Sequence, residues 1–77
     1  MTVYLKFFAG LRDALPAGQR PYPAQMDEGA TVRLVLGVFG VPPDKPAILL
    51  VNGRHAALDH VLVDGDLLAV FPPVAGG

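Results

Sequence analysis

Residues 31–40, TVRLVLGVFG, predict the main helix of this chain. Thr31 is a favourable N-cap, because its hydroxyl can accept a hydrogen bond from a backbone N–H of the first turn. Gly40 readily adopts the left-handed conformation that ends many helices, and the Pro-Pro pair at 42–43 prevents the helix from continuing. We therefore expect a helix that begins after Thr31 and ends at about Phe39.

Apolar residues occupy two sides of this predicted helix. Four of them have the i, i+3, i+4, i+7 spacing of a buried stripe: Val32, Val35, Leu36 and Phe39. Three more form a second row, called the helix ridge below: Leu34, Val38 and Val41. Together with any exposed apolar residues of the sheet, the helix ridge would form a docking patch larger than a monomer normally exposes, so we expect a partner to cover part of this surface. The alternative is that the turn at Leu11–Leu15 folds back over the ridge.

Two strands are predicted before the helix. Residues 3–8, VYLKFF, alternate in a period-two pattern rich in β-branched and aromatic side chains, which is typical of a strand. Residues 22–26 also alternate, but Pro21 and Pro23 have no N–H to donate to a neighbouring strand. This second segment is therefore expected at an edge of the sheet, or in a bulged and irregular pairing.

Three strands are predicted after the helix. Ile48–Val51 is typical of a buried strand, and Asn52-Gly53 is the strongest short signal for a hairpin turn. We expect the return strand at Arg54–Ala57. A second turn at Asp64–Asp66 precedes Leu67–Phe71, an apolar run short enough to be a central strand buried on both faces. The resulting order of strands around one helix predicts a single α+β domain.

The composition excludes several classes of protein. A chain of 77 residues forms one domain, and the absence of cysteine excludes disulfides and thiolate metal sites. A net charge of −1 with only two lysines provides no basic stripe for nucleic acid. Even the longest apolar runs, such as Ala47–Val51, are much shorter than a bilayer span, and the N-terminus does not resemble a signal peptide. We expect a cytoplasmic protein with no nucleic-acid and no membrane partner.

The usual enzymatic motifs are missing from the sequence. It has no serine, no cysteine and no glycine-rich phosphate loop. His55 and His60, with Asp59 beside one of them, lack a compact third metal ligand and are more typical of surface residues. Asp64 and Asp66 lack the ligand spacing of a calcium loop and are more typical of a turn. We expect no metal site and no independent active site.

The C-terminal segment is the remaining candidate for chemistry. Pro72 and Pro73 favour an extended backbone, so six residues could project the terminus about 19 Å from the sheet. Gly76 and Gly77 have no Cβ atoms and could enter a narrow channel of a partner. The reactive group would be the α-carboxylate of Gly77, which a partner must activate because this chain has no nucleotide site. The alternative is an ordinary frayed terminus.

Several segments together resemble the MoaD/ThiS family of ubiquitin-like sulfur-carrier proteins. They are Phe7-Phe8-Ala9, Val51-Asn52-Gly53, Asp64-Gly65-Asp66 and Phe71-Pro72-Pro73-Val74-Ala75-Gly76-Gly77. The last of these is most similar to the MoaD branch, the small subunits of molybdopterin synthase. The resemblance implies a ubiquitin-like β-grasp fold, in which a mixed sheet packs on one main helix. It divides the chain into a β-grasp domain at 1–71 and an extended tail at 72–77.

The resemblance also implies a reaction cycle. An E1-like partner uses ATP to adenylate Gly77, sulfur replaces AMP to give a thiocarboxylate, and the large subunit of molybdopterin synthase consumes the sulfur. This chain would then be a non-catalytic small subunit that binds no cofactor itself. Gly77 would carry the sulfur, and Gly76 would allow entry into the partner's channel. The approach to that channel would be formed by Phe71, Pro72, Pro73, Val74 and Ala75.

Three alternatives remain open at this point. The carrier could serve thiamine synthesis or another sulfur pathway, with thiazole synthase as the acceptor in the thiamine case. The chain could be a ubiquitin-like modifier whose Gly77 forms an isopeptide bond with a lysine. It could also be a β-grasp interaction module with an inert tail.

Overall fold

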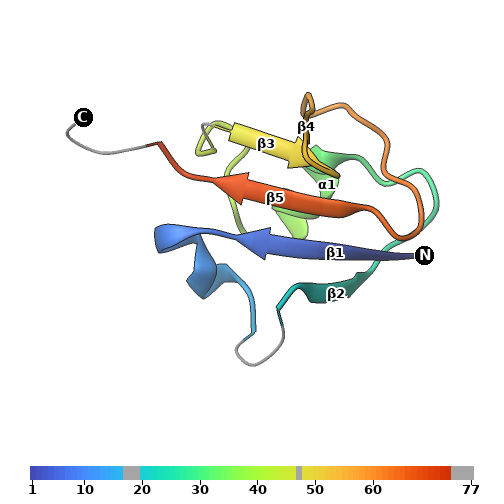
Figure 1. The fold of residues 1–77 in the computed structure, drawn as a ribbon, viewed down its shortest axis with the longest axis horizontal. Coiled ribbons are helices and arrows are strands. Elements are labelled where there is room, and N and C mark those ends of the chain that lie inside the picture. The colour runs from blue at the N-terminus through green and yellow to red at the C-terminus, as the bar shows by residue number, and fades with distance from the viewer. Residues whose placement is uncertain (17–19, 47, 74–77) are drawn as a thin grey trace.

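Five strands form one mixed sheet in the order β2-β1-β5-β3-β4, and one α-helix crosses a single face of it (Figure 1). The computed structural model describes residues 1–16, 20–46 and 48–73. The elements are β1 (Thr2–Phe7), the 3-10 helix η1 (Ala9–Ala14), β2 (Tyr22–Gln25), α1 (Val32–Val38), β3 (Ile48–Val51), β4 (Arg54–His55) and β5 (Leu67–Phe71). This is the expected α+β arrangement of a mixed sheet on one main helix. Within the described ranges, no helix has the length and apolar character to cross a membrane.

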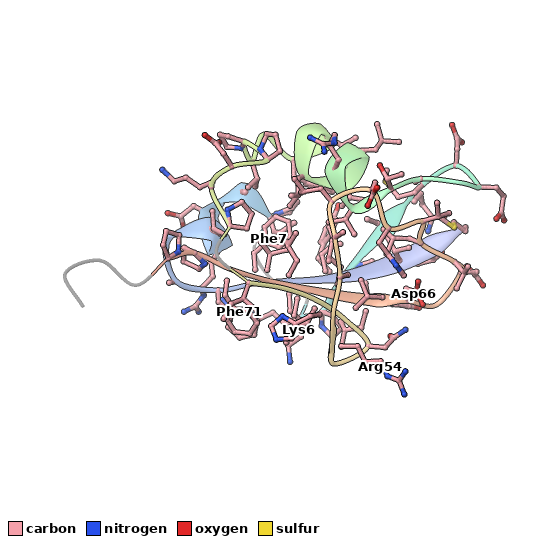
Figure 2. The ribbon with its side chains drawn as sticks, turned by 90° about the horizontal axis from the view of Figure 1, so that it is seen from above. Lys6, Phe7, Arg54, Asp66 and Phe71 are labelled. Carbon is pink, nitrogen blue, oxygen red and sulfur yellow. The ribbon has the colours of Figure 1, made fainter. Side chains whose placement is uncertain are left out.

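The core lies between α1 and the two central strands. β1 and β5 run parallel, with Leu5 opposite Leu68 and Phe7 opposite Val70. Because side chains alternate along a strand, these residues share the face that packs on the helix, whereas Lys6 points to the other face (Figure 2). The helix contributes the predicted stripe to the same core. Three residues of the stripe are fully buried: Val32, Val35 and Leu36.

Side-chain and backbone hydrogen bonds define both ends of α1. The Thr31 hydroxyl accepts a hydrogen bond from the Leu34 N–H at 3.2 Å, so Thr31 is the N-cap as predicted. At the other end, the Gly40 N–H donates to the Gly37 carbonyl at 3.2 Å and the Val41 N–H donates to the Leu36 carbonyl at 2.8 Å. With a φ of +74° at Gly40, these two bonds form a Schellman motif. The helix therefore ends at Val38, with Phe39 as its C-cap.

The Schellman motif removes one residue, Val41, from the predicted helix ridge. It turns Val41 into the core, where the side chain is 3% exposed, so the prediction that placed Val41 on the ridge is wrong. Leu34 and Val38 remain 50% and 59% exposed. The alternative in which the Leu11–Leu15 turn covers the ridge is also wrong, because Leu11 belongs to η1 and joins the core beside β1. Whether a partner covers Leu34 and Val38 stays a prediction.

β2 is an edge strand, as its prolines predicted. Its pairing with β1 is nevertheless regular: the antiparallel register runs from Thr2 opposite Gln25 to Leu5 opposite Tyr22 without a bulge. The expected irregularity is absent from this ladder because an edge strand tolerates a proline whose missing N–H is not needed by the neighbouring strand. Pro23 accordingly lies opposite Tyr4 within the pair.

The hairpin between β3 and β4 forms at Asn52-Gly53, with φ values of +52° and +82°. β4 contains only Arg54 and His55, so the predicted return strand at 54–57 is too long by two residues. After His55 the chain leaves the sheet, and its backbone carbonyls accept hydrogen bonds from the start of α1 instead. The His60 and Leu58 carbonyls accept hydrogen bonds from the Val32 and Arg33 N–H groups at 3.0 and 2.9 Å.

Candidate functional site

The chain leaves the sheet from its central strand. β5 lies between β1 and β3 and ends at Phe71, where Pro72 and Pro73 follow at the rim of the sheet (Figure 1). Phe71 and Pro72 are half-buried, whereas Pro73 is exposed. The backbone therefore passes from the middle of the fold to its surface within three residues, Phe71–Pro73, which we call the tail base. The predicted roles of Val74, Ala75, Gly76 and Gly77 concern positions outside the described residues.

An aromatic stack holds the tail base against β1. The rings of Phe8 and Phe71 are stacked, with their centroids 4.2 Å apart and 6° between their planes. Phe8 directly follows β1, and its N–H donates a hydrogen bond to the Val70 carbonyl at 3.0 Å. Because β1 and β5 run parallel, their carboxyl ends meet at the same edge, which is why these two rings can touch.

A lysine extends this stack. The Lys6 Nζ atom lies 5.9 Å from the centroid of the Phe8 ring, within the range of a cation–π interaction. Figure 2 shows Lys6 and Phe71 on the face of the sheet that faces away from α1, with Phe7 on the opposite side. The first residue of the tail base is thus fixed by one aromatic neighbour, and a positive charge lies beside that neighbour.

The sheet face that carries the stack is largely apolar and has no helix over it in Figure 2. Strand alternation and register place the following side chains on this outer sheet face: Tyr4, Lys6, Ile48, Leu50, Leu67, Ala69 and Phe71. Tyr4 and Ile48 are 37% and 41% exposed. Ile48 lies directly opposite Phe71 in the ladder, so the outer sheet face is continuous with the tail base. A face of this composition suits the docking of another protein.

Sequence reasoning found the tail base but missed the stack, and it expected exposed apolar residues on the sheet without indicating which face carries them. Phe8 was placed in the first predicted strand and in a family motif, but the alternation of residues 3–8 does not say which face of the sheet a helix will cover. The contact between Phe8 and Phe71 could have been predicted from a parallel pairing of the first and last strands. That pairing is implied by the β-grasp fold but not by either strand alone.

The aspartates considered as metal ligands have structural partners. Asp66 is 7% exposed, and its two carboxylate oxygens accept hydrogen bonds from Asn52 Nδ2 at 2.8 Å and from the Val63 N–H at 2.9 Å. Asp64 Oδ1 accepts a hydrogen bond from the Thr2 N–H at 2.7 Å. These contacts confirm the turn interpretation, because each carboxylate stabilises the loop that leads into β5.

The histidines do not form a metal cluster with these aspartates. His55 and His60 are exposed and line a shallow hollow together with Arg54 and Val61. In residues 1–16, 20–46 and 48–73, no three His, Cys, Asp or Glu side chains are grouped closely enough to hold a metal ion. The tail base and the outer sheet face remain the candidate functional site.

Comparisons with known proteins agree with this architecture. The model of the family described as Mut7-C ubiquitin matches residues 1–76. The chain is 37% identical to small archaeal modifier protein 3 from Haloferax volcanii over 94 aligned positions, which cover both proteins completely.

Two solved structures are similar over nearly the whole chain. The crystal structure of SAMP1 from Haloferax volcanii has a TM-score of 0.73 and 33% identity, with complete coverage of both chains. The putative molybdopterin converting factor, subunit 1 from Pyrococcus furiosus has a TM-score of 0.72 and 31% identity, and the match covers 95% of this chain and 98% of that one. The expected ubiquitin-like β-grasp fold is therefore confirmed.

Proposed function

The chain belongs to the Mut7-C ubiquitin family of MoaD/ThiS-like, ubiquitin-like proteins, and from this premise we propose that it carries sulfur on Gly77 for molybdopterin biosynthesis. The observation that supports the proposal most directly is the tail base. A central strand delivers the chain to the rim of the sheet, and four residues of sequence remain between Pro73 and the terminal carboxylate. A carrier needs its reactive group beyond the body of the fold, where the active site of another protein can reach it.

The chemistry requires an activating partner. A carboxylate is a poor electrophile, so the E1-like enzyme transfers AMP from ATP to the Gly77 carboxylate and releases pyrophosphate. Hydrosulfide, or a donor at the same oxidation level, then attacks the acyl carbon, AMP leaves, and a thiocarboxylate forms. The large subunit of molybdopterin synthase is the proposed acceptor of that sulfur. Support for this acceptor comes from the similarity to the Pyrococcus furiosus protein named as a molybdopterin converting factor subunit.

The same geometry suits the docking of the two partners. The outer sheet face offers apolar side chains next to the tail base, and the Phe8–Phe71 stack limits the directions in which the chain can leave β5. A tail with a fixed starting direction loses less conformational freedom when it enters a channel, which favours binding. This chain supplies the carried carboxylate, and the partners supply the catalytic groups.

A ubiquitin-like modifier is the second candidate, and one observation favours it. The Haloferax volcanii relative at 37% identity is named a small archaeal modifier protein. The two functions share the adenylate and differ in the group that attacks the acyl carbon. A sulfur carrier takes up sulfur, whereas a modifier transfers its acyl group to the ε-amine of a lysine. Thiamine synthesis, with thiazole synthase as acceptor, is a variant of the first function.

Intact-mass measurement tests the proposal. The protein is incubated with the E1-like enzyme of its own genome, ATP and sodium sulfide, and we expect a gain of about 16 Da when sulfur replaces one oxygen. A variant that lacks Gly77 is the control and should show no gain. Discrete conjugates on lysines without any thiocarboxylate would favour the modifier. An unchanged mass with an enzyme that adenylates other carriers would contradict the sulfur-carrier function.

A further inference from the structure

A hollow of about 570 Å³ lies beside the tail base, between the end of β1 and η1. We call it the basic hollow; its lining residues include Lys6, Phe8, Arg12, Asp13, Leu15 and Arg20. The three basic residues come from different segments, because Lys6 belongs to β1, Arg12 to η1, and Arg20 to the segment before β2. Phe8 is shared with the aromatic stack, so the hollow and the tail base have a common wall.

The charge of this hollow is opposite to that of the whole chain. The sequence has six basic and seven acidic residues and a net charge of −1. Three of the six basic residues line the hollow, against a single acidic one, Asp13. Such a concentration of one sign creates a local positive potential on a slightly negative protein.

Four of the seven acidic residues lie at the other end of the central strands: Asp27, Glu28, Asp64 and Asp66. Asp64 accepts a hydrogen bond from the Thr2 N–H at the start of β1, and the Asp66 carbonyl accepts one from the Tyr4 N–H at 2.8 Å. Asp27 and Glu28 follow Met26, whose N–H donates to the Met1 carbonyl. The protein is therefore negative where β1 begins and positive where β1 ends, next to the tail base.

We propose that the basic hollow docks an acidic segment of the enzyme that activates the tail. This inference rests on the proposed function, since it names the chemistry of the partner surface at that site. Lys6, Arg12 and Arg20 are exposed and stand around the hollow rather than inside a closed cavity. Exposed cations attract a small anion only weakly, whereas several carboxylates on one protein segment interact with all three together.

The lining also favours a protein segment over a nucleic acid. Phe8, Leu15 and Pro16 add apolar groups to the lining of the hollow, beside the basic residues. An acidic peptide that also carries apolar side chains complements both features, while three cations are few for a phosphate backbone. Because the hollow adjoins the tail base, a segment bound there brings the partner's active site close to the departing chain.

The first experiment tests the charge of the hollow without any enzyme. A polyglutamate peptide is titrated into the ¹⁵N-labelled protein at low ionic strength, and backbone amide shifts are followed by NMR. We expect the largest shifts at Lys6, Phe8, Arg12 and Arg20, and their loss in Arg12→Glu. The matched control is Arg33→Glu, which makes the same charge change at an exposed position of α1. Equal losses in both variants, or shifts centred on α1, would overturn the proposal.

The second experiment measures docking of the activating enzyme. We expect Arg12→Glu to lower kcat/KM for adenylation of the tail about tenfold at low salt, with kcat nearly unchanged and a smaller effect at high salt. Arg33→Glu should change kcat/KM less than about twofold under the same conditions. Salt-independent adenylation that Arg12→Glu does not alter would refute the acidic partner segment. If the wild-type chain is never adenylated, the proposed function fails, and the peptide titration still tests the hollow by itself.

Discussion

Phe8 and Phe71 lie ring against ring at 4.2 Å, although 62 residues separate them along the chain. The contact joins the ends of the first and last strands at the point where the tail base begins. The Ile48 side chain flanks the same point from the other neighbouring strand, β3. Phe71 therefore has a neighbour on each side, and the direction in which the backbone leaves the sheet is set by the fold.

Replacing the Phe8 ring should weaken the tail base. We expect Phe8→Leu to lower the free energy of unfolding by about 1 kcal/mol, because a stacked aromatic pair contributes that much beyond its buried area. The rate of tail adenylation should fall as well, since the starting direction of the tail is less restricted. Urea denaturation and the adenylation assay measure the two effects. Phe8→Tyr keeps the ring and is the control; if it behaves like Phe8→Leu, stacking is not the cause.

The carboxylate of Asp66 should contribute more to the free energy of unfolding than the carboxylates of exposed aspartates. Asp66→Ala removes the acceptor for Asn52 Nδ2 and for the Val63 N–H, and we expect a loss of about 2–3 kcal/mol in unfolding free energy. Asp66→Asn retains one acceptor oxygen and should lose less. Asp59→Ala, at an exposed position, serves as the control and should stay within about 0.5 kcal/mol of wild type. Equal effects of Asp66→Ala and Asp59→Ala in urea denaturation would contradict this role.

Two glycines near the end of α1 should respond in opposite ways to alanine. Gly40 has a φ of +74°, so Gly40→Ala should cost about 1–2 kcal/mol through backbone strain, although its added Cβ would meet no atom within 4 Å. Gly37 lies inside the helix with equally open space, and Gly37→Ala should stabilise the protein by up to about 1 kcal/mol. Thermal unfolding of both variants compares the signs. Two changes of the same sign would be incompatible with the Schellman motif described above.

Local sequence patterns were enough to predict most elements of the fold. Thr31 and Gly40 mark the ends of a helix through their own backbone preferences, and Asn52-Gly53 specifies a hairpin through positive φ values. The edge position of β2 follows from Pro23 in the same way. In each case the physical cause lies within a few residues, so the local sequence is enough to predict the helix ends, the hairpin and the edge strand.

The features that sequence reasoning missed involve contacts with other parts of the fold. Val41 is buried because the Schellman motif redirects the chain, and β4 stops at His55 because the following carbonyls bond to the start of α1. Lys6, Arg12 and Arg20 line the same hollow, although no spacing in the sequence indicates that they lie close together. Each of these features depends on tertiary contacts, which single-sequence patterns do not contain.

Two exposed apolar faces compete as the docking surface for the activating enzyme. Ile48 lies on the outer sheet face, directly opposite Phe71, whereas Val38 and Leu34 lie on the helix ridge, on the other side of the sheet. Burial of Val41 reduces the ridge to two residues, while the outer sheet face extends over three strands. Because the tail and its docking surface must engage the same enzyme, we expect the outer sheet face to dominate.

Glutamate substitutions on the two faces decide between them. We expect Ile48→Glu to reduce kcat/KM for tail adenylation about tenfold or more, because a charge on an apolar interface must be desolvated without a partner. Val38→Glu should have the smaller effect. Both side chains are more than 40% exposed, so unfolding free energies should change little and any loss of activity reflects docking. The reverse order of effects would place the enzyme on the helix ridge.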